Sequence, residues 1–168
     1  MSRRDLTYKW AMYGGAVLAV VLVQSLVLNY IRVLSVHPFL LPMLVGIIAA
    51  YEGTQGGYTF GLIFGVLCDI TIQAPVPCFF TLDFVVIALI TSLIAKNLIA
   101  PGFLCTLVVS AVSLLLTQLF YTVIYTYRSI ASSMGVLNLM GREMLVSMVL
   151  SPLLYLLFFR IFRKTRPD

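Results

Sequence analysis

The sequence predicts an all-α integral membrane protein with six transmembrane helices. Of its 168 residues, 61% are hydrophobic and only 10% are charged. A soluble domain of this size needs about a quarter of its residues charged to cover its surface. The apolar stretches are also continuous, whereas the strands of a membrane barrel alternate apolar and polar residues. Lipid is therefore the expected solvent for most of the chain, and helices are the expected way to cross it.

Apolar runs separated by turn-forming residues place the six spans. About 20 residues, at a rise of about 1.5 Å each, cross a hydrocarbon core of about 30 Å. The second and third spans are short, and the turn-rich stretch 52–56 joins them into a helical hairpin. The only sizeable polar connection is predicted at residues 128–143. The spans lie at about 10–31, 38–51, 57–72, 79–95, 103–127 and 144–162, within a single membrane domain over 1–168.

The basic residues predict how the spans are oriented, because cytoplasmic loops are enriched in Lys and Arg. With six spans, both termini and the loops near residues 53 and 96 share one side. That side holds eight of the eleven basic residues, which are Arg3, Arg4, Lys9, Lys96, Arg160, Arg163, Lys164 and Arg166. The other side holds Arg32, Arg128 and Arg142. Both termini are therefore predicted to be cytoplasmic. The net charge of +5 indicates contacts to anionic lipids, and no nucleic-acid binding is expected.

The most informative pattern is a small-residue row at Gly53, Gly57, Gly61 and Gly65, which continues to Asp69. Four residues advance about 400° on a helix, so this row winds slowly around one face. Membrane helices associate through such faces, because glycine lets two backbones approach closely. The face formed by Gly57, Gly61 and Gly65 packs either against another helix of this chain or against the helix of a partner protein.

A second, shorter row of small residues lies in the first predicted span. Ala11, Gly15 and Ala19 are also four residues apart. This row has the same two interpretations, since the spacing alone does not say which helix it contacts.

Two carboxylates lie inside or beside the predicted spans, where ionisable groups are costly and often functional. Asp83 falls in the first turn of its span, where the helix dipole favours a carboxylate, and Thr81 is the candidate cap. Asp69 ends its span, where the dipole is unfavourable, so it needs a partner. Arg32 at the outer end of the first span is the nearest candidate by topology. A structural ion pair of Asp69 with Arg32 is favoured, and a proton or cation site is the alternative.

The sequence offers no recognisable catalytic machinery. It has one histidine, His37, and no pattern typical of a nucleophile with its base, a metalloprotease or a phosphate-binding loop. Cys68, Cys78 and Cys105 lack the spacing of a metal site, and they are predicted to be free thiols that act as small apolar residues. A Cys68–Cys78 disulfide is the alternative. We therefore expect no enzyme activity, no cofactor and no metal.

One stretch resembles a known family. His37-Pro38-Phe39-Leu40-Leu41-Pro42, a short span, and then Gly61-Leu62-Ile63-Phe64-Gly65-Val66-Leu67-Cys68-Asp69 are similar to the rod shape-determining protein family MreD. That family has a proline-led second span and a G-F-x-x-G-x-x-x-D pattern in the third. Here Leu62 replaces the usual phenylalanine, and the loop that follows Asp69 lacks the glycines often found there. The similarity covers about residues 37–100.

The resemblance implies a non-enzymatic scaffold of the cell-elongation machinery in the bacterial plasma membrane, which supports rod shape and peptidoglycan synthesis. Its implied partner is the single-span protein MreC, with MreB, RodA and a penicillin-binding protein nearby. The family also resembles the substrate-binding subunits of energy-coupling-factor transporters, which share a six-helix fold. The alternative function is therefore a vitamin-uptake subunit, which needs an outward pocket lined with polar residues.

Overall fold

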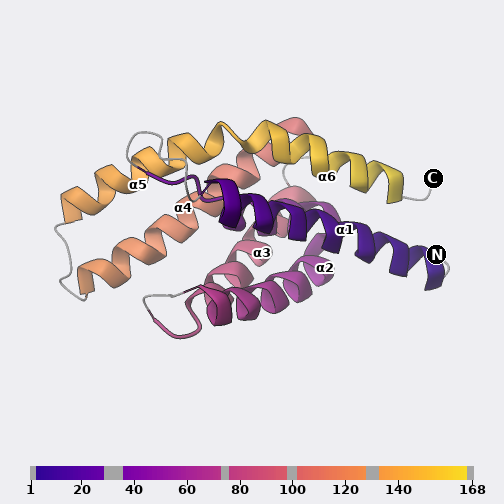
Figure 1. Ribbon diagram of the computed structural model, residues 1–168, viewed down its shortest axis with the longest axis horizontal. Coiled ribbons are helices and arrows are strands. Elements are labelled where there is room, and N and C mark those ends of the chain that lie inside the picture. The colour runs from indigo at the N-terminus through magenta and orange to yellow at the C-terminus, as the bar shows by residue number, and fades with distance from the viewer. Residues whose placement is uncertain (1–2, 29–35, 73–75, 98–101, 128–132, 166–168) are drawn as a thin grey trace.

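The computed structural model describes residues 3–28, 36–72, 76–97, 102–127 and 133–165, and these residues form helices joined by short connections. The predicted all-helical class is therefore confirmed. Figure 1 shows the first turns of α1 and the last turns of α6 at the same end of the molecule. The elements are α1 (Arg3–Val23), the π-helix η1 (Gln24–Leu28), α2 (Leu41–Thr71), α3 (Phe79–Asn97), α4 (Phe103–Tyr127), α5 (Ser133–Met148) and α6 (Ser151–Thr165).

Three helical stretches of the described chain are long and apolar enough to cross a membrane: Tyr8–Leu26, Phe79–Asn97 and Phe103–Tyr127. A fourth is added if Asn138–Met148 and Ser151–Arg163, which are bent by 47° at a short break, are counted as one span. The membrane character of the sequence is thus supported by these helices. The count of six spans stays a prediction.

The last third of the chain differs from its predicted layout. Residues 128–143 were expected to form a polar connection, but α5 begins at Ser133. The predicted span at 144–162 is interrupted after Met148 and resumes as α6 at Ser151. Pro152 gives the physical reason, because a proline has no N–H to continue the hydrogen bonds of α5 but is tolerated in the first turn of a new helix.

The two short spans predicted at 38–51 and 57–72 are the halves of α2. The break between them is narrower than the predicted turn, because Gly53 alone departs from helical geometry, at φ 76° and ψ −174°. Only glycine adopts this backbone conformation readily. The halves touch near the break: a Cβ added to Gly57 would lie 2.6 Å from the Cα of Ala49.

We expect Gly53→Ala to lower the free energy of unfolding by about 1–3 kcal/mol, because a side chain strains this conformation even where space is available. The melting temperature of the purified protein in detergent measures the effect. Gly141→Ala is the matched control, since a Cβ on Gly141 meets nothing within 4 Å and its backbone is helical. Equal melting temperatures for Gly53→Ala and the wild type would contradict this expectation.

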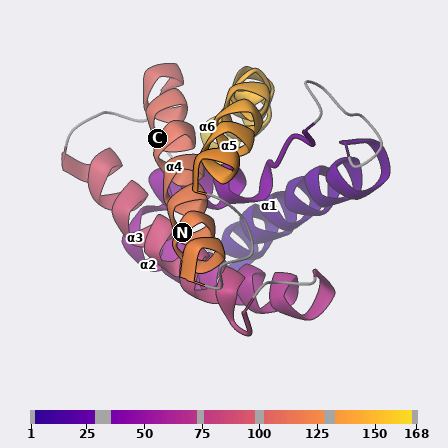
Figure 2. The same ribbon diagram turned by 90° about the vertical axis from the view of Figure 1, so that its left-hand side faces the viewer.

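The first half of α2 is the centre of the bundle. Every residue from Leu41 to Tyr51 is buried, as expected for a helix that is apolar on all sides. The ring of Tyr51 stacks on Phe162 of α6 at 4.9 Å, and its hydroxyl shares a 2.7 Å hydrogen bond with Thr106 of α4. A Cβ added to Gly46 in this segment would meet Ser113 of α4 and Thr91 of α3, so both helices pack against it. Figure 2 shows α1 and α3 on opposite sides of the molecule, with α4 between them.

Candidate functional site

The contact between α2 and α3 is built on two glycines of the predicted row. A Cβ on Gly65 would lie 2.6 Å from the Cα of Thr81 and 2.9 Å from the carbonyl oxygen of Phe80. A Cβ on Gly61 would lie 2.9 Å from the carbonyl oxygen of Phe84. Both glycines therefore touch the backbone of α3, and Gly57 touches Ala49 of its own helix. In this chain, the face formed by Gly57, Gly61 and Gly65 is occupied by the chain's own helices.

Asp69 completes the same contact one helical turn further along. Its Oδ1 accepts the backbone N–H of Phe80 at 2.9 Å, and its Oδ2 accepts the backbone N–H of Thr81 at 2.9 Å. The hydroxyl of Thr81 donates to Oδ2 at 2.6 Å. The first N–H groups of a helix have no partner within it, and they carry partial positive charge. Asp69 therefore caps α3 from the end of α2.

These hydrogen bonds provide the partners that Asp69 was predicted to need at the end of its helix. Arg32, the predicted partner, lies outside the described residues, so the ion pair between them stays a prediction. Thr81 was the candidate cap for the turn that contains Asp83, but its hydroxyl is bonded to Asp69 instead.

Asp83 lies deeper than predicted. α3 begins at Phe79, so Asp83 follows the first turn, and it is only 1% exposed. The hydroxyl of Thr117 in α4 donates to its Oδ2 at 2.7 Å. Its Oδ1 is buried and has no hydrogen-bond partner among the described residues. Burying a polar atom without a partner is costly. The proton or cation site that is the alternative for Asp69 stays a prediction.

A cavity of about 660 Å³ lies between α1 and the second half of α2. Apolar side chains form most of its walls, among them Val17 and Val21 from α1 and Phe60, Phe64 and Leu67 from α2. Polar side chains also line it: Gln24, Ser25, His37, Thr71 and Glu143.

Hydrogen bonds fix the polar part of the cavity in place. The side chain of Gln24 donates to the carbonyl of Pro38 at 2.7 Å and accepts the N–H of Leu40 at 3.1 Å. The N–H of Phe39 donates to the hydroxyl of Ser147 in α5 at 2.9 Å. Gln24 opens the π-helix η1, and such π-bulges are frequent at functional sites.

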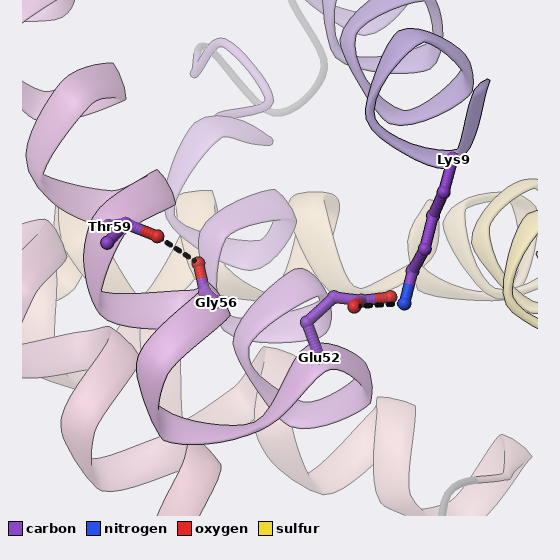
Figure 3. A network of polar contacts seen from close by, with 4 residues as sticks. All are labelled: Lys9, Glu52, Gly56 and Thr59. Carbon is purple, nitrogen blue, oxygen red and sulfur yellow. Dashed lines mark hydrogen bonds and ion pairs between the residues drawn. The ribbon is translucent and has the colours of Figure 1, made fainter. Parts of the chain in front are cut away.

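The other end of the contact between α1 and α2 is held by an ion pair. The ammonium group of Lys9 lies 2.5 Å from Oε2 of Glu52, beside the break at Gly53 (Figure 3). Both side chains are mostly buried, at 16% and 8% exposure, so water screens the attraction less than at a protein surface. The ion pair therefore attaches α1 to α2, and Gln24 attaches η1 to the residues just before α2.

The small-residue row of α1 faces outward. Ala11, Gly15 and Ala19 are all exposed, and a Cβ on Gly15 would meet nothing within 4 Å. No other helix of the described chain covers this row. The two predicted rows thus differ, because one is buried inside the molecule and the other is open.

Sequence reasoning missed the cavity and the residues at its polar end. Glu143 was placed in a loop, whereas it lies on α5 and faces Gln118 of α4, whose amide nitrogen is 3.4 Å from Oε2. A signal was present in Gln24, a polar residue inside an apolar span, but it does not say which backbone groups it bonds. Cys68, Cys78 and Cys105 are free thiols, as predicted. Among the residues that the structure places, no three His, Cys, Asp or Glu side chains are grouped to hold a metal.

Comparison with known proteins adds no further assignment. No protein-family model, curated protein or solved structure matches this chain.

Proposed function

We propose that this chain is a non-enzymatic membrane scaffold of the bacterial cell-elongation machinery, which binds the spanning helix of a partner similar to MreC. The residues that resemble the MreD family support this proposal, because they act together. Gly61 and Gly65 bring α2 onto the backbone of α3, and Asp69 caps α3. A pattern used in this way specifies how two helices pack and carries out no reaction.

The observation that carries the proposal is the open small-residue row on α1. Spanning helices associate by close packing of small residues, since lipid offers no hydrophobic force between them. Gly57, Gly61 and Gly65 already contact helices of this chain. Ala11, Gly15 and Ala19 are exposed. The partner helix is therefore proposed to pack on α1 along this row.

The positions of the two termini support an even number of spans, and we propose six, with both termini in the cytoplasm. α1 starts and α6 ends at the same end of the molecule (Figure 1). Arg160 and Arg163 are exposed near the end of α6, where they can contact anionic lipids of the inner leaflet. In this orientation MreB would approach from the side of the termini, and RodA and a penicillin-binding protein would lie beside the bundle in the membrane.

One observation favours the alternative function, a vitamin-uptake subunit of an energy-coupling-factor transporter. The cavity between α1 and α2 has a volume in the range of about 300–1,000 Å³ that is usual for small-molecule sites. Its walls are mostly apolar, however, and only a few polar side chains line it. A polar vitamin would leave much of its surface against apolar side chains.

Affinity purification from the native bacterium in mild detergent tests the proposal. We expect a single-span elongation protein to be recovered with the wild type. Gly15→Leu should lower that recovery about tenfold while the melting temperature stays unchanged, because the added side chain holds a partner helix away. Gly141→Leu, an exposed glycine on α5, is the matched control and should retain the partner.

Other results would contradict the scaffold. Recovery of paired ATPases in place of an elongation protein supports the transporter. Depletion of the protein should round rod-shaped cells. Rods of normal width in rich medium, with growth that depends on one added vitamin, would overturn the scaffold. Full partner recovery with Gly15→Leu would show that the row on α1 is a lipid-facing surface.

A further inference from the structure

The cavity between α1 and α2 opens at the surface of the molecule, between exposed apolar side chains. Leu18 of α1 and Ile63 of α2 line it, and each is 61% exposed. Both residues lie on helices whose outer faces carry large apolar side chains. A molecule that enters between them therefore comes from the bilayer and must have an apolar part.

The size of the cavity excludes a spanning helix as its occupant. One turn of a helix about 10 Å wide, with a pitch of about 5.4 Å, fills about 420 Å³. The cavity of about 660 Å³ would hold only about a turn and a half. This volume suits a molecule with one apolar chain and a small head group. The cavity is therefore a different site from the row proposed for a partner helix.

Three polar groups of the cavity, Gln24, His37 and Glu143, lie close together. Gln24 is bonded to the backbone at Pro38 and Leu40, which places His37 beside it. His37 also lies close enough to Glu143 of α5 to interact electrostatically. Three separate segments of the chain thus converge on one point, while Gly14, Val17 and Phe60 line the apolar remainder.

The charge at this end selects the chemistry of the head group. Glu143 is the only carboxylate in the lining, and no Lys or Arg of the described chain lines the cavity. The hydrogen bond that Glu143 accepts from Gln118 is long, at 3.4 Å, so the carboxylate oxygens of Glu143 can accept further donors. Repulsion from Glu143 disfavours an anionic head, and an ammonium group can donate up to three hydrogen bonds.

We infer that this cavity binds a single-chain amphiphile with a primary amine head: the chain lies between α1 and the second half of α2, and the ammonium group bonds to Glu143 near Gln24 and His37. The amphiphile would reach the site laterally from the membrane, between Leu18 and Ile63. The inference is independent of the scaffold proposal, because it concerns the isolated chain.

The test uses the purified protein in nanodiscs of phosphatidylcholine. The protein is labelled with a photoreactive alkylamine that carries a diazirine in its chain. Mass spectrometry locates the labelled residues. We expect labelling on the cavity walls, at residues such as Val17, Phe64 and Leu67. Unlabelled dodecylamine should compete for the site, and dodecyl sulfate should not. Labelling spread evenly over the lipid-facing helices would overturn the inference, as would equal competition by the sulfate.

Two variants test separately the part of the cavity that holds the alkyl chain of the amphiphile and the part that binds its head group. Gly14→Phe should lower labelling about tenfold, because Gly14 lines the cavity and a Cβ there meets nothing within 4 Å, so the ring fills the cavity without a clash. Gly141→Phe, outside the cavity, is the matched control and should label like the wild type. Glu143→Gln should abolish the preference for dodecylamine over dodecanol. Unchanged labelling of Gly14→Phe, or an unchanged preference in Glu143→Gln, would overturn the inference.

Discussion

Gly65→Leu is expected to leave little folded protein in the membrane. A Cβ at this position already comes within 2.6 Å of the Cα of Thr81 and 2.9 Å of the carbonyl oxygen of Phe80. These are backbone atoms of α3, so no side-chain rotation relieves the overlap. Overpacking by a few methylenes in a tight core costs about 1–3 kcal/mol, and a clash with backbone costs more. The four carbons of leucine must therefore push α3 away from α2.

The same displacement would break the cap of α3. The bonds from Phe80 and Thr81 to Asp69 are at 2.6–2.9 Å, and they weaken steeply when the donors move away. The effect of Gly65→Leu should therefore exceed that of Gly61→Ala, which adds one carbon facing the carbonyl of Phe84. Fluorescence-detected size-exclusion chromatography of detergent extracts measures the folded fraction.

Gly141→Leu is the control for this series, because a side chain there enters open space. It should extract and elute like the wild type. A folded fraction for Gly65→Leu equal to that of Gly141→Leu would mean that α2 and α3 do not need close backbone contact.

The sequence predicted the close helix contact but not its partner. Four-residue spacing of Gly57, Gly61 and Gly65 indicates a face that another backbone approaches, and the structure has such a face. The spacing is equally compatible with a helix of this chain and with a foreign one. The identical spacing of the row around Gly15 leads to the opposite arrangement, an exposed face. The two rows differ because α3 packs on one of them and not on the other. The local sequence of a row does not encode where α3 lies.

The requirement for a partner at Asp69 was likewise predictable, and the partner was not. A carboxylate at the end of a helix needs donors, and Arg32 was the candidate because a basic residue is visible in a sequence. The donors found in the structure are mainly backbone N–H groups of α3. Every residue except proline has such a group, so a sequence gives no signal of which one is used.

The segment around Glu143 shows a limit of hydropathy. Asn138, Arg142 and Glu143 lower the apolar character of this stretch, and it was therefore predicted to be a connection. In the structure it is α5, and its polar residues are placed on specific sides, with Glu143 facing Gln118 and the cavity. Average polarity over a window cannot distinguish a loop from a helix that uses a few polar residues at a site.

Asp69→Asn is expected to lower the free energy of unfolding by about 2–4 kcal/mol. The two carboxylate oxygens accept three hydrogen bonds at the start of α3. The amide of asparagine retains one acceptor, and its NH₂ group would face an N–H or O–H donor. At least one donor of Phe80 or Thr81 then loses its partner, and the negative charge that favours the helix start is lost.

Asp83→Asn is the matched control, since it makes the same chemical change at a carboxyl with one bond. The asparagine oxygen can still accept the hydroxyl of Thr117, and its NH₂ group replaces an oxygen that has no partner in the described structure. We expect a change below about 1 kcal/mol. Thermal unfolding of both variants in detergent gives the comparison. Should Asp69→Asn unfold like the wild type yet fail to support growth, Asp69 would be a proton or cation site instead of a cap. A larger loss in Asp83→Asn than in Asp69→Asn would mean that the buried carboxyl, and not the cap of α3, holds these helices together.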